Sequence, residues 1–194
     1  RNRAIQEMMR SGEGLKTFYR FIANNPHIAL HDACQIVIER PSASICFSFE
    51  EWNAQGRRVT KGRKGIPYYD NDGSKHFVFD VSDTHGDNRY RRSITPVKKI
   101  LDGLDLVNGT EIAGSNRGDY RIMLSGVVNY LGQNEFFTED EDRNRLIAEG
   151  VTYLLYSTTG FPKGRGITLK GYPYGLSENA DLFREILKTT EVLQ

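Results

Sequence analysis

Apolar residues near the start of the chain recur with the spacing of an α-helix. Leu15, Phe18, Tyr19 and Ile22 fall at positions i, i+3, i+4 and i+7, which predicts a helix over residues 15–23 with one face toward a core. Residues 4–9 favour a shorter helix before it. Residues 27–39 predict a third helix that is apolar on much of its surface, so we expect it to be central, and Pro41 ends it.

The middle of the chain has the short, β-branched and aromatic runs that are typical of strands. Residues 44–49 predict a buried strand, and the Ser-x-x-Glu pattern of Ser48 and Glu51 predicts a capping box that opens a short helix carrying Trp52. Gly56 is expected to end this helix. Residues 65–69 and 76–81 alternate around the turn at residues 70–73, which predicts an antiparallel hairpin.

The last half of the chain is mainly helical in pattern. Residues 82–93 are polar and predict a loop, and residues 94–106 have an ambiguous pattern for which we expect a helix. Further helices are expected over residues 119–131, from a second capping box at residues 138–141 to about Ser157, and over residues 178–192. Residues 159–175 predict a loop with one strand at 166–169.

These elements together predict an α+β fold in which several helices flank a small antiparallel sheet with a central hairpin. The chain has 194 residues, which indicates one domain over residues 1–194. Within it we expect an α+β core at about residues 15–100 and a mainly helical extension at 118–194.

Composition excludes several classes of protein. Hydrophobic residues make up 38% of the chain, too many for a wholly disordered protein, and a net charge of +1 excludes a histone-like polycation. The chain has no run of 18 apolar residues, so no membrane span is predicted.

The chain starts Arg1-Asn2-Arg3 without an initiator Met or an apolar signal region, so we expect a fragment or a processed chain of a cytoplasmic protein. Cys34 and Cys46 form no disulfide framework, fit a reducing cytosol and are expected to be unpaired and buried.

Candidate catalytic and metal-binding motifs are incomplete. His27 and His31 stand four residues apart, which predicts one helix face, but Ile28 occupies the position of the general base in a zinc-peptidase helix. The turn at residues 70–73 lacks the downstream Glu of a calcium loop, because position 81 is Val81. Residues 160–166 lack the Gly-Lys-Ser/Thr ending of a phosphate loop. We therefore expect no enzyme activity, metal site or cofactor.

Positive charge gathers in the segment from Gly56 to Lys64, which we call the basic segment. It carries five cations and no acidic residue: Arg57, Arg58, Lys61, Arg63 and Lys64. A second cluster follows at Arg89, Arg91, Arg92, Lys98 and Lys99. Such groups can neutralise phosphates, and aromatic side chains among them can stack on the bases of a single strand. The aromatic residues interleaved with these clusters are Trp52, Tyr68, Tyr69, Phe77, Phe79 and Tyr90.

We expect the basic side chains to contact phosphates, and Trp52, Tyr68 and Tyr69 to stack on bases or support the hairpin. Phe77 and Phe79 are expected to face the core. Gly56, Gly62 and Gly65 should permit tight turns and a close approach to the strand. Trp52 can equally be a core anchor, because Trp is usually largely buried.

The stretch from Ser48 to Ile66, with its Trp, spaced Gly, Val and Lys-Gly-x-x-Gly pattern, resembles the N-terminal domain of ArdC-type antirestriction proteins. Residues 77–84 resemble the strand of that family that ends in a polar residue and Thr, and residues 40–43 resemble its lead-in to the first strand. The resemblance covers about residues 15–84. It implies a single-stranded-DNA-binding domain of a plasmid, conjugative element or phage, whose relatives protect incoming DNA from host restriction.

The second half of the chain departs from that family, because it lacks the His-Glu-x-x-His of the metallopeptidase domain that many members carry. Residues 150–156 look more like the N-terminal part of large mobile-element proteins that continue into helicase- or methylase-like regions. Direct antirestriction activity is therefore less strongly implied than DNA binding.

Two other functions remain open. The chain can be a protein-interaction module that inhibits a host defence nuclease or docks a larger helicase- or methylase-like protein. The acidic residues 139–142 and the tyrosines Tyr172 and Tyr174 would serve there. It can also be a degenerate or metal-dependent enzyme that uses His27, His31 and Asp32.

Overall fold

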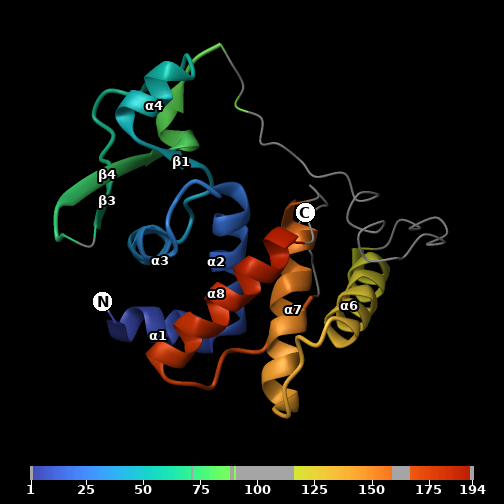
Figure 1. The fold of residues 1–194 in the computed structure, drawn as a ribbon. Coiled ribbons are helices and arrows are strands. Elements are labelled where there is room, and N and C mark those ends of the chain that lie inside the picture. The colour runs from blue at the N-terminus through green and yellow to red at the C-terminus, as the bar shows by residue number, and fades with distance from the viewer. Residues whose placement is uncertain (1, 71, 88–89, 91–115, 159–166, 193–194) are drawn as a thin grey trace.

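The computed structural model of this chain describes residues 2–70, 72–87, 90, 116–158 and 167–192. The fold is α+β and mostly helical, as the sequence predicts. Figure 1 shows a helical layer in the lower part of the view, and a small sheet with a short helix above it at the upper left. No described helix is long and apolar enough to cross a membrane.

The helical layer contains α1 (Asn2–Arg10), α2 (Gly12–Asn24), α6 (Asn116–Gln133), α7 (Glu141–Thr158) and α8 (Leu176–Val192). Helix α7 is central, because α2, α6 and α8 all pack on it and its residues from Leu146 to Tyr156 are buried except Glu149. The ring of Phe18 on α2 packs edge-on against Phe183 of α8, with centroids 5.0 Å apart. The buried hydroxyl groups of Tyr19 and Tyr172 are hydrogen-bonded in the same core.

Helix α3 (Leu30–Glu39) joins the helical layer to the sheet, because it packs against α1 and α2 and against β3. Its residues from Ala33 to Val37 are buried. It starts three residues later than expected, so His27 precedes the helix and does not share a helix face with His31. As expected, it lies between other elements, while α7 is central within the helical layer.

The sheet has the strand order β1 (Cys46–Phe47), β4 (Lys75–Asp80) and β3 (Ile66–Tyr69), and both pairings are antiparallel. The predicted hairpin is therefore confirmed, with Ile66 opposite Val78 and Tyr69 opposite Lys75. Ile66 and Val78 are buried, which places one face of the sheet on the core with α3. Side chains alternate across a strand, so their neighbours in sequence lie on the opposite face.

A second, two-stranded sheet lies beside the first and was not predicted. It pairs β2 (Arg58–Val59) with β5 (Thr84–His85) in antiparallel register. A 3₁₀ turn, η1 (Val81–Asp83), leads from β4 into β5. The prediction of a loop over residues 82–93 is therefore wrong at its start.

Two further local predictions are wrong, and one lies outside the described residues. The side chain of Asp140, and not that of Thr138, accepts a hydrogen bond from the first turn of α7, at 2.9 Å from the amide nitrogen of Arg143. Residues 167–169 form no strand in the described part of the chain. The helix expected over residues 94–106 lies outside the described residues.

Cys34 and Cys46 are unpaired and buried, as predicted. Burial raises the pKa of both thiols to about 12, so neither is a thiolate at neutral pH. The described residues contain no group of three or more His, Cys, Asp or Glu side chains that could hold a metal ion.

Candidate nucleic-acid interface

The basic segment follows α4 (Phe49–Ala54), whose start is a capping box as predicted. The Ser48 hydroxyl accepts a hydrogen bond from the Glu51 amide at 3.2 Å, and the Glu51 carboxylate accepts one from the Ser48 amide at 2.8 Å. Gly56 ends the helix region with a φ of 74°, and Gly62 turns the chain with a φ of 85°. A side chain is unfavourable at such angles, so both glycines have the turn role that was expected of them.

Of the roles that the sequence left open for Trp52, its burial fits the core anchor and not the stacking on a base. Its side chain is 0% exposed. The indole Nε1–H donates a hydrogen bond to the carbonyl oxygen of Phe79 at 2.8 Å. The rings of Phe47 and Tyr90 pack edge-on against it, at centroid distances of 5.0 and 5.7 Å. Trp52 therefore ties α4 to β4 and has no face available for a ligand.

Arg57 is half-buried, and its guanidinium is hydrogen-bonded within the protein. Its Nε donates to the Thr84 hydroxyl at 2.8 Å, and its Nη2 donates to the Thr84 carbonyl at 3.1 Å. The guanidinium carbon lies 5.9 Å from the centroid of the Trp52 ring. These contacts fix the start of β2 on β5 and engage the guanidinium of Arg57 within the protein.

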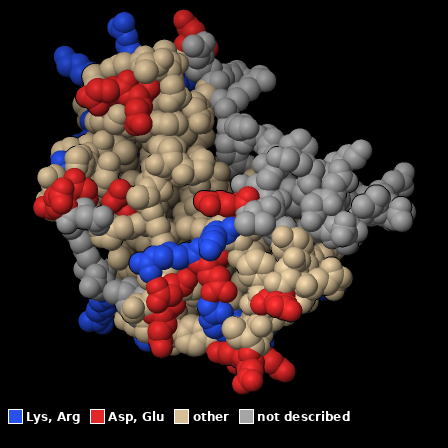
Figure 2. Space-filling model, viewed as in Figure 1, with Lys and Arg blue, Asp and Glu red and all other residues tan. Residues whose placement is uncertain are grey.

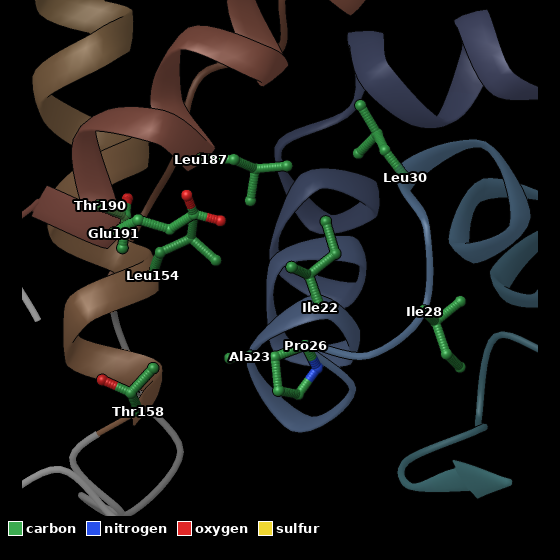
Figure 3. Close-up of a pocket in the computed structure, with 10 residues that line it drawn as sticks. All are labelled: Ile22, Ala23, Pro26, Ile28, Leu30, Leu154, Thr158, Leu187, Thr190 and Glu191. Atoms are coloured by element: carbon green, nitrogen blue, oxygen red, sulfur yellow. The ribbon is translucent and has the colours of Figure 1, made fainter.

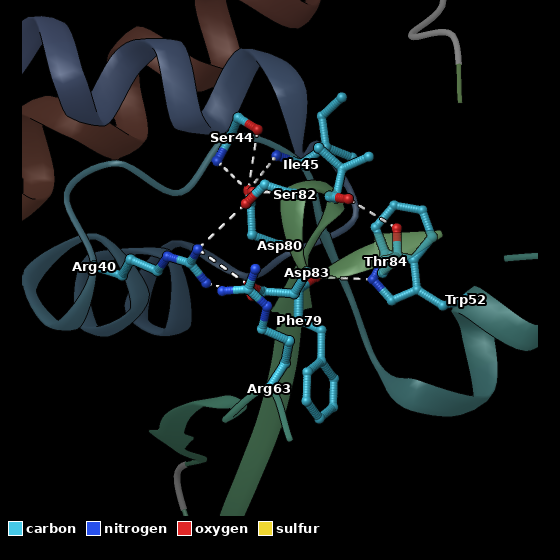
Figure 4. A network of polar contacts seen from close by, with 11 residues as sticks. Arg40, Ser44, Ile45, Trp52, Arg63, Phe79, Asp80, Ser82, Asp83 and Thr84 are labelled. Carbon is cyan, nitrogen blue, oxygen red and sulfur yellow. Dashed lines mark hydrogen bonds and ion pairs between the residues drawn. The ribbon is translucent and has the colours of Figure 1, made fainter. Parts of the chain in front are cut away.

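A network of polar contacts holds the other end of the segment (Figure 4). The Asp83 side chain is 3% exposed and forms an ion pair with Arg40 that uses both carboxylate oxygens. This contact with Asp83 raises the pKa of Arg40. The Asp83 carbonyl accepts a hydrogen bond from the Thr60 amide at 2.8 Å, which fixes the chain between Val59 and Lys61.

Asp80 supports the same network from β4. Its carboxylate accepts hydrogen bonds from the amides of Ser44, Ile45 and Ser82 at 2.6–3.2 Å, and from the Ser44 hydroxyl at 3.0 Å. Burial alone would raise the pKa of Asp80, but these hydrogen bonds outweigh it and keep the pKa below its ordinary value. The backbone that carries the basic segment is therefore rigidly supported.

Four of the five cations of the basic segment are exposed: Arg58, Lys61, Arg63 and Lys64. Among the described residues, the ion pairs of the segment amount to one long contact, in which the Arg63 Nε lies 3.9 Å from the Asp83 Oδ1. Figure 2 shows Lys and Arg side chains projecting at the upper left with carboxylates below them, whereas both signs are interspersed over the helical layer. The exposed cations can bind an external anion without first breaking a strong internal pair.

The two tyrosines of β3 lie on opposite faces of the sheet. Tyr68 is on the face toward α3, where its ring stacks on His76 at 5.3 Å. Burial, and then the charge of Asp32 and Glu51, raises the pKa of Tyr68. Tyr69 is on the other face, and its backbone N–H and C=O are both bonded by the Gln35 amide, at 3.2 and 2.7 Å. The structure therefore does not bring Tyr68 to the side on which Tyr69 lies.

Among the described residues, the exposed aromatic side chains are Phe49, which sequence reasoning missed, and Phe77, which it assigned to the core. Their side chains are 49% and 48% exposed, so the prediction that Phe77 faces the core is wrong. Phe79 is partly exposed on the same face of β4. Strand alternation with the buried Val78 requires this arrangement, but the sequence does not say which of the two faces is covered. Lys75, two residues before Phe77, was the one local sign of an outward face.

The aromatic and basic groups adjoin each other. Phe49 and Asn53 line one shallow hollow together with Arg57, Arg58 and Val59. Gly65 comes directly after the basic segment, and a Cβ there would lie 3.0 Å from the Cβ of Phe77. Gly65 therefore packs closely against the protein's own aromatic rings, and the expected close approach of a nucleic-acid strand stays a prediction. Arg89, Arg91 and Arg92 of the second cluster lie outside the described residues, as do Lys98 and Lys99.

Comparison with protein-family models, with curated proteins and with solved structures finds no match. The resemblance to the ArdC-type domain therefore stays a prediction, and the function is argued from the residues themselves.

Proposed function

We propose that this chain is a sequence-tolerant single-stranded-DNA-binding domain, with no catalytic step of its own. The supporting observation is that four cations of the basic segment stand exposed on a framework fixed by Arg40 and Asp83. Because the backbone that carries these cations is held in place, binding a phosphate requires ordering of their side chains but not of the chain itself. Contacts to phosphates carry no direct sequence information, which is why we propose tolerance of sequence.

The roles within the basic segment divide according to burial and partners. Arg58, Lys61, Arg63 and Lys64 contact phosphates, and Arg57 positions them through its hydrogen bonds to Thr84. The resemblance of residues 15–84 to the ArdC-type domain agrees with this proposal and adds a setting, a mobile genetic element.

The test is fluorescence anisotropy with single-stranded DNA, duplex DNA and RNA of equal length, each at two or more salt concentrations. The variant replaces Arg58, Lys61, Arg63 and Lys64 with Ala. Removing one cation from a phosphate should lower the slope of log affinity against log salt by about 0.7 for a single strand, so the fourfold variant should lower it by up to about 2.8.

The matched control removes four exposed cations from the helical layer: Arg121, Arg145, Arg184 and Lys188. It changes the net charge equally and should keep the salt slope of the parent chain. Equal losses of affinity in both variants would mean that net charge, and not this site, attracts the DNA. A parent chain that binds no nucleic acid at low salt would refute the proposal outright.

One observation favours the second candidate, a protein-interaction module. A cavity of about 410 Å³ opens between α2 with the loop after it and the ends of α7 and α8 (Figure 3). Its lining is mainly apolar, and its two threonine hydroxyls donate within their own helices, Thr158 to Leu155 and Thr190 to Ile186, both at 2.7 Å. An apolar side chain of a partner would fit such a lining. Binding there should survive high salt, whereas binding to phosphates should not.

A further inference from the structure

The face of the β3–β4 hairpin that points away from α3 carries a row of aromatic side chains. Phe77 and Phe79 lie on it because Val78 between them is buried on the other face. Phe49 at the start of α4 continues the row, with its ring centroid 6.5 Å from that of Phe79. We call Phe49, Phe77 and Phe79 the aromatic face. Phe49 and Phe77 are two of the four large hydrophobic side chains that are exposed in the described part of the chain.

The chain that pairs with β4 has little side-chain bulk beside the aromatic face. Pro67 pairs with Phe77 across the hairpin, and the chain before β3 has only a glycine, Gly65, beside Phe77 and Phe79. A Cβ at Gly65 would lie 3.2 Å from the Phe79 Cζ, so the rings of Phe77 and Phe79 pack against the backbone of this glycine. The contact with Gly65 supports one side of each ring and leaves the other side open to solvent.

Positive charge borders the aromatic face on two sides. The Lys75 Nζ lies 5.0 Å from the centroid of the Phe77 ring, within the range of a cation–π contact. On the other side, Phe49 shares its hollow with Arg58 of the basic segment. A flat aromatic surface between cations is complementary to a strand whose bases are unpaired and whose phosphates lie alongside.

On the basis of the DNA-binding function proposed above, we propose that Phe49 and Phe77 are the residues on which bases stack, and that Lys75 contacts an adjacent phosphate. In a duplex the base faces are covered by neighbouring base pairs, so only a single strand can use this surface. The aromatic face, and not Trp52, would then set the preference for single strands, while the basic segment attracts both forms.

The test compares Phe49→Ala and Phe77→Ala with Ile122→Ala, which removes a side chain that is 39% exposed on α6. All three sites are exposed, so the variants should unfold at nearly the parent temperature. Stacking is worth about 1–3 kcal/mol per base, so each Phe variant should bind single-stranded DNA about 5- to 150-fold more weakly. Duplex affinity and the salt slope should stay within twofold of the parent, and Ile122→Ala should change nothing.

A second variant reports contact directly. Phe77→Trp places an indole on the aromatic face, where single-stranded DNA should quench its fluorescence, while the parent chain with only the buried Trp52 should show little quenching. Unchanged affinity of both Phe→Ala variants, or equal losses for duplex and single strand, would overturn the stacking role. If the Ala variants of the basic segment still lose salt-dependent binding in that case, the proposed function stands without it. If the parent chain binds nothing, both fall.

Discussion

Replacing Trp52 with alanine removes the largest of the fully buried side chains in the described structure. Truncation of a buried Trp costs about 3–5 kcal/mol of unfolding free energy, because the cavity is only partly refilled. The carbonyl oxygen of Phe79 also loses the indole N–H that lies 2.8 Å from it, which adds about 1 kcal/mol. The expected total of about 4–6 kcal/mol is comparable to the lower end of the stability of native domains, about 5–15 kcal/mol.

The variant Trp52→Phe separates the two contributions to this loss of unfolding free energy, the cavity and the indole hydrogen bond. It keeps an aromatic ring between Phe47 and Tyr90 but has no N–H for the Phe79 carbonyl, so we expect a loss of only about 1–2 kcal/mol. Urea denaturation followed by far-UV circular dichroism measures both variants, because neither retains the tryptophan for fluorescence. The free energy should fall in the order parent chain, Trp52→Phe, Trp52→Ala.

Single-stranded-DNA binding of the folded variants completes the test. If Trp52 is an anchor, affinity per folded molecule should stay near that of the parent chain under conditions in which the variant is folded. A Trp52→Ala protein with an unchanged urea midpoint and a large loss of affinity would refute the anchor role and restore the stacking role.

Two further predictions concern the groups that hold the sheet. Asp80→Asn should lower stability by roughly 1–3 kcal/mol at pH 7, since the carboxylate accepts four hydrogen bonds. Because the folded-state pKa of Asp80 is depressed, its contribution is present above the unfolded pKa of about 4 and is lost as pH falls through the folded pKa. The variant should therefore show weaker acid destabilisation in thermal melts as pH falls below about 4, unlike Asp72→Asn in the exposed turn. Gln35→Ala should expose the backbone of Tyr69 on the edge strand β3, where Pro67 already lacks an N–H, and so favour self-association in analytical ultracentrifugation. The control is Gln6→Ala on α1, and a Gln35→Ala protein that stays at the parent's association state would show that the amide does not protect this edge.

Elements with a strong local signal could be predicted from the sequence. The stripe of Leu15, Phe18 and Tyr19 is buried on α2, because helical spacing alone places these residues on one face. The capping box of Ser48 and Glu51 was predictable for the same kind of reason, since its partners are three residues apart. The β3–β4 hairpin joins strands through a short turn of typical residues, so it too depends on neighbours in sequence.

Pairings between distant residues carried no such signal. Strands β2 and β5 have two residues each and are separated by more than twenty positions, so neither has a pattern that could mark it as a strand. The bond from Arg57 to Thr84 and the ion pair of Arg40 with Asp83 likewise join residues 27 and 43 positions apart. Sequence could identify the basic segment as charged, but only these contacts show which of its cations are left exposed.

In the candidate site, single residues show what the sequence determines and what only the tertiary structure decides. The sequence by itself determined that Phe77 and Val78 lie on opposite faces of a strand, because side chains alternate along it. Only the tertiary structure decided which face is covered: α3 packs beside β3 and the core includes Val78, so Phe77 is left in solvent. Trp52 was open between two roles until the position of β4 was known, because an indole on a short helix is buried only if another element, here the Phe79 carbonyl and the Phe47 ring, lies over it.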